Sequence, residues 1–398
     1  MAELAILGGN PVYTGSWPTW PQWDQSEEKA LIDVLHSGRW QAGGRVQSFE
    51  QAFASYQQAK HGICVTNGTA SLETALRALG VGPGDEVIVP AYTFSSSGLS
   101  VLVVGATPVL VDVDQWLNID TDILPGYITP RTKAIMPVHL GGIPANMDGV
   151  LAAAKEHNLA IIEDAAQAHG SEWRGTRVGA IGDVGSFSFQ TGKVMTCGDG
   201  GILVTNDEEL AHKLRLFREF GRVPHPDGFD YLVAGSNERL TEFQAAILHC
   251  QLLRLDEQIA RRRQAADYLA ERLEDVPGVK FHGLPEGVTR WCVYIFALWV
   301  DREAFAGCSK SLICRALNAE GIPVERGYQS LADFTVYKAA QAKGQCRIGS
   351  LAKTKQAVDS VLWLTFPAFM QGLEAVDAVV EALRKVQAYA GKLRELES

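Results

Sequence analysis

The sequence predicts an α/β fold, in which a mostly parallel central sheet flanked by helices is followed by a smaller C-terminal α+β domain. First, from Ile63 onward short apolar runs alternate with helical segments, a pattern that produces βαβ units around a buried parallel sheet. Second, one long helical stretch runs from Leu240 to about Leu273 and leads into a new unit near Gly278. Third, 398 residues are enough for two or three domains. We expect a large domain over 1–277, including the N-terminal arm and the long helix, and a small domain over 278–398.

The large domain begins with two amphipathic helices and continues with the strands of the sheet. The first helix is expected at 27–37, with Gly38 as its stop, and the second at 46–57. The apolar strand segments that follow are ICVTN, EVIVP, TPVLVDV, KAIMPV and LAIIED. The helices between them are expected at 69–79, from about 95, and near 147–157. Two further strands, at 186–189 and 201–204, are joined by a glycine-rich connection.

The small domain has its own alternation of elements. CVYIFALWV and IPVER have the composition of strands, and SLICRALNAEG between them has helical spacing and ends at Gly321. A last helix is expected from about Leu373.

Charge and cysteine content limit the classes of function. Lys+Arg 36 against Asp+Glu 46 gives a net charge of −10, which argues against a nucleic-acid partner because that affinity depends on cationic contacts. The seven cysteines are an odd number without a C-x-x-C pair, a pattern that indicates reduced thiols rather than disulfides or a zinc site. The apolar stretch 87–111 is interrupted by Pro, Gly and Ser, which favours strand, loop, buried helix and strand over a membrane span. We expect a cytoplasmic protein with no membrane partner and no metal.

The first candidate binding element is the segment Thr66–Ser71, which directly follows a strand and opens a helix. Gly68 removes side-chain bulk there, and the exposed N–H groups and the helix dipole favour a phosphate group. The segment is also compatible with an ordinary helix cap, since Asn and Thr are common capping residues.

An acid and a lysine follow two other strands. Asp164 ends LAIIED, where ligands bind in open α/β sheets, although it could equally cap the next turn. Lys193 lies after SFSF, in a turn bounded by glycines. Its neighbours are apolar, which argues against an ordinary solvated lysine on the surface. Such a lysine is able to act as an imine-forming nucleophile. Together, a phosphate cradle, an acid for a ring nitrogen and a buried lysine are what pyridoxal 5'-phosphate requires.

Five longer motifs extend over most of the chain, namely VTNGTASLETALRALGVGPGDEVIVPAYTFSSS, TPRTKAIMPVHLGG, IIEDAAQAHG, GDVGSFSFQTGKVMTCGDGG and GSNERLTEFQAAIL. With them the sequence resembles the DegT/DnrJ/StrS family of pyridoxal-phosphate-dependent aminotransferases. The resemblance implies a fold-type I transferase that forms a homodimer with shared active sites. It also implies a ping-pong transfer of an amino group from L-glutamate or L-glutamine to a keto-sugar or keto-cyclitol, as in antibiotic or polysaccharide biosynthesis.

The same resemblance implies roles for individual residues around the cofactor ring. Lys193 would form the covalent imine with the cofactor and move the proton during catalysis. Asp164 would pair with the pyridinium nitrogen, Gln167 would lie near the ring hydroxyl, and Phe94 would stack on the ring.

Four residues are assigned to the phosphate by the same resemblance. Thr69 and Ala70, partly through their backbone N–H groups, and Ser188 would bind it from the same chain. Asn237, in the Gly-Ser-Asn motif, would reach it from the partner subunit.

The sequence departs from the family pattern at several positions. Gln190 stands three residues before Lys193, where many relatives have His, while Lys193 itself distinguishes the chain from related dehydratases, which have His there. The segment 327–332 lacks the His-Tyr-x-Pro-x-His pattern of nucleotide-sugar relatives. The Trp-rich N-terminus is most similar to the inosose aminotransferase and 3-amino-5-hydroxybenzoate synthase branch.

Two other functions remain open at this stage. A pyridoxal-phosphate lyase of the 3-amino-5-hydroxybenzoate synthase type would dehydrate and aromatise an amino-cyclohexenone. A non-catalytic regulatory homologue would keep the fold without turnover, although the intact set of Lys193, Asp164 and Ser188 argues against it.

Overall fold

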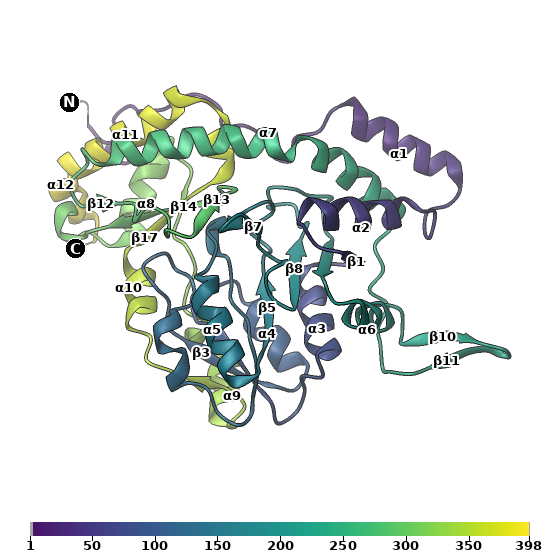
Figure 1. Ribbon diagram of the computed structural model, residues 1–398. Coiled ribbons are helices and arrows are strands. Elements are labelled where there is room, and N and C mark those ends of the chain that lie inside the picture. Colours follow the sequence, from purple (N-terminus) through teal and green to yellow (C-terminus); the bar gives the residue numbers. More distant parts are fainter. Residues whose placement is uncertain (1–2, 398) are drawn as a thin grey trace.

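The computed structural model describes residues 3–397, and its large domain is built on an eight-stranded sheet (Figure 1). The strands lie in the order β1 (His61–Val65), β9 (Gly201–Thr205), β8 (Val184–Ser188), β5 (Ala160–Asp164), β4 (Thr132–Ile135), β2 (Glu86–Pro90), β3 (Thr107–Val111) and β16 (Arg347–Ile348). β9 is antiparallel to β1 and β8, and the other neighbouring pairs are parallel. The predicted mostly parallel sheet is therefore confirmed.

Helices cover both faces of this sheet, because successive strand residues send apolar side chains to opposite sides. Ile88, Ile135 and Ile161 belong to the core on one face, and their neighbours Val87, Ala134 and Ile162 to the core on the other. The first core is closed by α2 (Arg45–Tyr56), α5 (Met147–His157) and α7 (Glu242–Leu273). The second is closed by α3 (Gly68–Ala78), α4 (Ser96–Val103), α6 (Glu208–Arg218) and α9 (Thr335–Ala342).

The C-terminal part of the chain forms a second sheet of four antiparallel strands. Its order is β12 (Val279–Lys280), β14 (Ile295–Val300), β17 (Val361–Thr365) and β15 (Val324–Glu325). The helices around it are α8 (Lys310–Ala319), α10 (Ala352–Ser360), α11 (Leu373–Ala388) and α12 (Ala390–Arg394). In Figure 1, α7 runs along one side of the molecule over both sheets. β16 also comes from this region but extends the large sheet, so the division at 277/278 stays a prediction.

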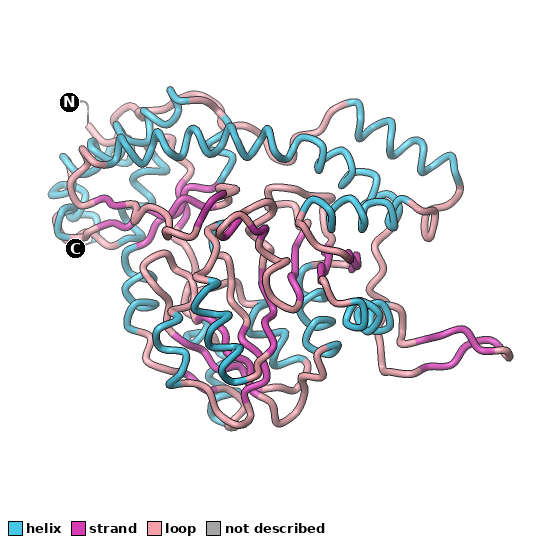
Figure 2. The backbone as a smooth tube through the Cα atoms, in the orientation of Figure 1, coloured by secondary structure: helices cyan, strands magenta, loops and turns pink. Residues whose placement is uncertain are grey.

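Two small features complete the fold. Strands β6 (Glu172–Trp173), β7 (Thr176–Arg177) and β13 (Val288–Arg290) form a three-stranded sheet between the two parts. The hairpin of β10 (Arg222–His225) and β11 (Gly228–Tyr231), which the sequence did not predict, projects away from the body of the molecule (Figure 2).

Most predicted elements are confirmed within two residues of their expected ends. The first helix, α1 (Gln25–Ser37), is started by a capping box at Asp24 and ended by Gly38 with φ 64°, a left-handed conformation that suits glycine. The apolar stretch 87–111 contains β2, α4 and β3, as expected. Within 3–397, the helices are too short or too polar to traverse a bilayer.

Candidate active site

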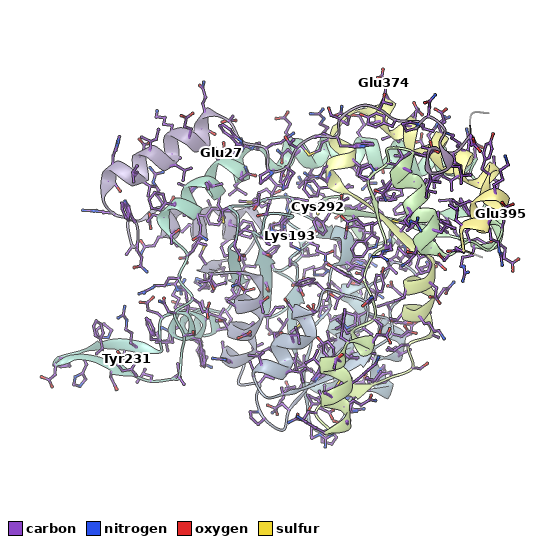
Figure 3. All side chains as sticks on the ribbon, turned by 180° about the vertical axis from the view of Figure 1, so that it is seen from behind. Glu27, Lys193, Tyr231, Cys292, Glu374 and Glu395 are labelled. Carbon is purple, nitrogen blue, oxygen red and sulfur yellow. The ribbon has the colours of Figure 1, made fainter. Side chains whose placement is uncertain are left out.

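A cavity of about 740 Å³ opens where the parallel strands of the large sheet end. The loops after β1, β2, β5 and β8 form its floor, and Glu325, Tyr328 and Trp363 from the C-terminal region form the opposite wall. This is the position at which open α/β sheets bind their ligands. Seven of the predicted site residues line the cavity, namely Thr69, Ala70, Phe94, Asp164, Gln167, Ser188 and Lys193. Figure 3 shows Lys193 well inside the outline of the molecule.

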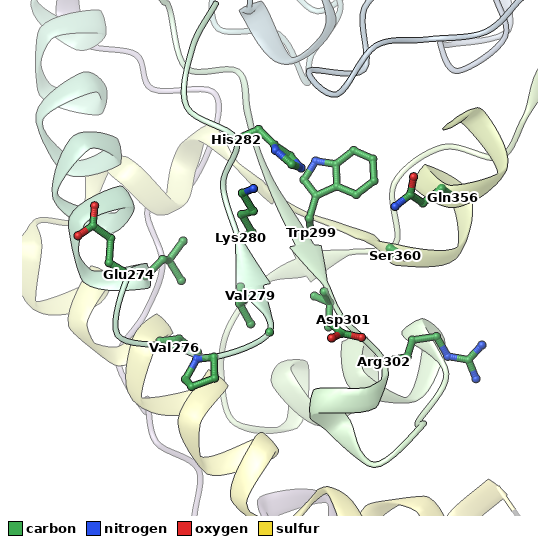
Figure 4. A pocket seen from close by; sticks show the side chains of 14 residues that line it. Glu274, Val276, Val279, Lys280, His282, Trp299, Asp301, Arg302, Gln356 and Ser360 are labelled. Carbon is green, nitrogen blue, oxygen red and sulfur yellow. The ribbon is translucent and has the colours of Figure 1, made fainter. Parts of the chain in front are cut away.

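A second cavity, of about 750 Å³, lies in the C-terminal domain beside Lys280, Trp299 and Arg302 (Figure 4). It contains none of the predicted site residues. We therefore assign the chemistry to the cavity at the strand ends.

The N-terminus of α3 approaches β8 closely enough to make an anion cradle. A Cβ atom on Gly68 would lie only 2.7 Å from Cβ of Ser188, so a larger residue would force the helix away from the strand. The side chain of Asn67 caps the helix by accepting the N–H of Ala70 at 2.8 Å. The N–H groups of Gly68 and Thr69 precede the first intrahelical bond and remain available for an anion. These features fit a phosphate group.

The capping bond changes the expected role of Ala70. Ala70 lines the cavity, but its N–H is already donated to Asn67. The hydroxyl of Thr69 is in hydrogen-bond contact with Ser96 at 2.7 Å, and the hydroxyl of Ser188 accepts the N–H of Gln190 at 3.3 Å. The roles of these residues toward phosphate stay predictions.

Asp164 presents a buried carboxylate at the end of β5. It is 6% exposed, and it accepts hydrogen bonds from Oγ of Ser97 at 2.7 Å and from the N–H of Ala166 at 3.3 Å. Burial raises the pKa of Asp164, because the low-dielectric surroundings disfavour the charge. Neither hydrogen-bond donor to this carboxylate carries a positive charge. A protonated ring nitrogen would supply that charge, so Asp164 fits the pyridinium of pyridoxal phosphate.

Gln167 joins the two walls of the cavity. Its Oε1 accepts the N–H of Gly141 at 2.7 Å, and its Nε2 donates to the hydroxyl of Tyr328 at 3.1 Å. Both ends of the amide are thus engaged by protein groups, and the expected contact with the ring hydroxyl stays a prediction.

The turn that carries Lys193 is fixed by several bonds to its backbone. The N–H of Lys193 donates to the carbonyl of Gln190 at 2.9 Å, and Oε1 of Gln190 accepts the N–H of Gly192 at 2.8 Å. The indole N–H of Trp20, from the N-terminal arm, donates to the carbonyl of Thr191 at 2.9 Å. Gln190, which stands where many relatives have His, therefore shapes the lysine turn.

The amine of Lys193 lies over an aromatic ring. Its Nζ is 4.8 Å from the ring centre of Tyr294, a cation–π distance. Tyr294 stacks with Phe366, and Phe366 contacts the edge of Trp20 at 4.7 Å between ring centres. This aromatic row connects the N-terminal arm to Lys193.

Phe94 lines the cavity, whereas Asn237 lies outside it. Phe94 lines the cavity, is 53% exposed, and lies 6.2 Å from Tyr328 between ring centres. Asn237 is exposed, is paired with Glu219 in an isolated bridge, and does not line the cavity of its own chain. The predicted contact of Asn237 with a partner subunit's site is untested.

Sequence reasoning missed several residues of the far wall. Tyr294 and Trp363 lie in or next to apolar strand segments and carried no motif of their own, while Glu325 ends a strand of only two residues. Tyr328 was noted only as part of a departure from the family pattern. No local signal identifies these residues, because they come from separate segments of the chain that only the fold brings to one cavity.

The chain is similar to known proteins along most of its length. Residues 21–384 match the model of the DegT/DnrJ/EryC1/StrS aminotransferase family. L-glutamine:2-deoxy-scyllo-inosose aminotransferase of Streptoalloteichus tenebrarius is 40% identical over 86% of this chain and 84% of its own. The dTDP-3-amino-3,4,6-trideoxy-alpha-D-glucose transaminase of Streptomyces venezuelae is 38% identical over 90% and 92%.

Solved structures show the same relationship. The crystal structure of 3-amino-5-hydroxybenzoic acid synthase superposes with a TM-score of 0.85 at 34% identity, covering 94% of this chain and 99% of its own. The fold is therefore that of the aminotransferases that use pyridoxal phosphate. The family model matches residues 21–384, and relatives match along most of the chain; the chain therefore belongs to the DegT/DnrJ/EryC1/StrS aminotransferase family.

Proposed function

We propose that this enzyme transfers an amino group from L-glutamine or L-glutamate to the keto group of a sugar or cyclitol, in a ping-pong reaction that uses pyridoxal phosphate bound covalently to Lys193. The observation that carries the proposal is the convergence of three groups on one cavity: the amine of Lys193, the buried carboxylate of Asp164 and the N-terminus of α3 next to Ser188. The names of the relatives support the donor and acceptor, since one transfers from glutamine to an inosose and another acts on a dTDP-linked sugar.

Each wall of the cavity has a separate task in this reaction. Pyridoxal phosphate, when bound, supplies an aldehyde to carry the amino group and a ring that accepts electrons. Asp164 would keep the ring nitrogen protonated, and the cradle at Gly68, Thr69 and Ser188 would hold the phosphate. Nζ of Lys193, released when the donor amine binds, would carry the proton between the two carbon atoms that exchange it.

We further propose that the enzyme is a homodimer with shared active sites in the cytoplasm. Asn237 is exposed in the single chain, and the projecting hairpin of β10 and β11 exposes Phe229 and Tyr231. Both features suit contact with a second copy. The seven cysteines are unpaired thiols, as expected in a reducing compartment.

The covalent role of Lys193 is tested by borohydride reduction followed by peptide mass spectrometry. We expect the reduced cofactor to be found on the peptide that contains Lys193, and we expect Lys193→Ala to lose both the label and turnover, by at least 10³-fold. Lys338→Ala, on the exposed face of α9, is the matched control. A K193A protein that kept its activity would show that the assignment is wrong.

The lyase remains the second candidate, because a solved 3-amino-5-hydroxybenzoic acid synthase shares the fold at 34% identity. Glutamine labelled with ¹⁵N at the α-amino group, together with a keto-cyclitol, separates the two reactions. Label in the product amine supports transfer, whereas loss of water without label supports the lyase. Freshly purified protein that never contains the cofactor would instead support a non-catalytic homologue.

A further inference from the structure

The proposed function leaves the form of the acceptor open, because relatives of similar identity act on a free inosose and on a dTDP-linked sugar. The two forms differ most in charge, since a nucleoside diphosphate adds two phosphate charges next to the sugar. The charge of the cavity wall therefore discriminates between them.

Five acidic side chains line the cavity. Glu73, Asp199, Glu238 and Glu325 line it in addition to Asp164, and of the lining residues in the described chain only Lys193 has a cationic side chain. Burial is the main cause of the raised pKa of Glu73; Arg77 lowers this pKa, and the carboxylate of Glu238 adds a smaller rise. A diphosphate would add like charge, and among the described residues that line the cavity only Lys193 could oppose it.

Glu325 is the acid placed nearest to the aromatic wall. The register of β15 and β17 pairs Glu325 directly with Trp363, so both side chains project from the same face of the small sheet. Both line the cavity. Among residues 3–397 the carboxylate of Glu325 has neither a hydrogen-bond partner nor an ion-pair partner, so it is free to accept hydrogen bonds from a ligand.

The rest of this wall is aromatic and tightly closed. The rings of Trp363 and Tyr328 meet edge to face at 4.5 Å between centres. Trp363 is 4% exposed, and its indole N–H interacts with the buried hydroxyl of Tyr92: burial raises the pKa of Tyr92, and this interaction partly offsets the rise. A Cβ atom on Gly327 would lie 2.5 Å from that hydroxyl and 3.1 Å from the indole nitrogen, so glycine lets the backbone pack directly against both side chains.

We infer that the acceptor is an uncharged, polyhydroxylated cyclic ketone that binds free of any nucleotide, with Glu325 accepting hydrogen bonds from its hydroxyl groups. Ring faces suit the C–H surface of such a molecule, and a carboxylate without a partner suits its O–H donors. The inference rests on the proposed function and specifies its acceptor. Glu325 acts here as a specificity residue.

The first test compares two acceptors with the holoenzyme in its amino-loaded form, prepared with glutamine and followed by the absorbance of the cofactor. The probes are scyllo-inosose and a dTDP-linked 4-keto-6-deoxyhexose. We expect kcat/KM for scyllo-inosose to exceed that for the dTDP-linked ketone by at least 100-fold. A preference for the dTDP-linked ketone would overturn the inference and leave the proposed transfer intact.

The second test changes Glu325 alone. For Glu325→Gln we expect KM for scyllo-inosose to rise at least tenfold, kcat to stay within threefold, and the glutamine half-reaction to stay within twofold. Glu325→Asp should recover part of the loss. Glu374→Gln is the control, since Figure 3 shows Glu374 at the outer edge of the molecule, far from Lys193. An unchanged KM for Glu325→Gln would overturn the role of Glu325.

A binding measurement separates failure of the inference from failure of the proposed function. Isothermal titration with myo-inositol and with dTDP, neither of which reacts, should show binding of myo-inositol that weakens in Glu325→Gln and no binding of dTDP. Tight binding of dTDP to the wild-type protein would contradict the inference, even if no ketone is turned over. If glutamine converts the cofactor but neither ketone reacts, the acceptor assignment is wrong while the donor half stands.

Discussion

The two walls of the cavity are built in different ways. On the large-domain wall, the polar groups of Asp164 and Gln167 are held by hydrogen bonds to neighbouring protein groups, and Gly68 is in close contact with Ser188. On the small-domain wall, the carboxylate of Glu325 has neither a hydrogen-bond partner nor an ion-pair partner within the described residues.

This difference separates two demands on the site. A cofactor that stays bound through every turnover requires groups that are already in position, because each ordered group costs conformational entropy only once, during folding. A substrate that must enter and leave is better served by groups that lack a protein partner and gain one on binding. Changes in the first wall should therefore affect the cofactor and both half-reactions, and changes in the second wall should affect mainly the acceptor.

After Lys193→Ala, the largest effect on the large-domain wall is expected for Asp164→Asn. Loss of the negative charge next to the ring nitrogen should lower kcat of both half-reactions by about 10²–10³-fold, the order found when a preorganised electrostatic group is removed. Stopped-flow absorbance with glutamine and then with a ketone measures both. If only one half-reaction slowed, Asp164 would not act through the shared ring.

In the protein without cofactor, Asp164→Asn should also change the thermal stability in a pH-dependent way. Burial raises the pKa of Asp164 in the folded state, so the folded protein binds this proton more tightly than the unfolded chain. The stability of wild-type apoprotein should fall as pH rises above the carboxyl's unfolded pKa, and the loss should persist at neutral pH. We expect Asp164→Asn to have a higher unfolding temperature than wild type at pH 7 and no advantage near pH 3. If the two proteins differed equally in unfolding temperature at pH 7 and pH 3, the buried charge of Asp164 would not be the cause.

A smaller effect is expected when the cradle itself is filled. In Gly68→Ala the new Cβ would lie 2.7 Å from Cβ of Ser188, so α3 must move at a cost of about 1–3 kcal/mol. We expect the affinity for pyridoxal phosphate to fall about 10–100-fold, measured by titration of the apoprotein. Gly126→Ala, where an added Cβ meets no atom within 4 Å, is the control and should bind the cofactor normally.

The smallest effect should come from the ring beneath the lysine. A cation–π contact is worth about 0.5–2 kcal/mol, so Tyr294→Leu should slow turnover about 2–30-fold without loss of bound cofactor. Tyr294→Phe keeps the ring and should remain within twofold of wild type. If the two variants were equally slow, the hydroxyl rather than the ring face would position Lys193.

The large-domain wall could be predicted from the sequence because its residues follow strands. Thr69, Asp164, Ser188 and Lys193 each stand within a few positions of an apolar run, and parallel strands bring their carboxyl ends to one edge. The family motifs then assign each of these residues a role. The helix ends were predictable for a similar local reason, as Gly38 shows.

The small-domain wall could not be predicted in this way. Glu325 lies in a strand of two residues, and its position next to Trp363 depends on a strand pairing between segments 38 positions apart. Trp20 lies 171 positions from Thr191, to which it donates a hydrogen bond. Contacts of this kind carry no periodic or motif signal.

The sequence by itself determined the fold class and the family and predicted a set of groups for the cofactor, because local hydrophobic pattern and short motifs encode strand ends and the turns after them. Only the tertiary structure decided what faces that set: an acidic, aromatic wall with a carboxylate that has no partner in the described chain. The physical reason is that side chains from two sheets meet through packing and strand register, which depend on the whole folded chain rather than on neighbours in sequence.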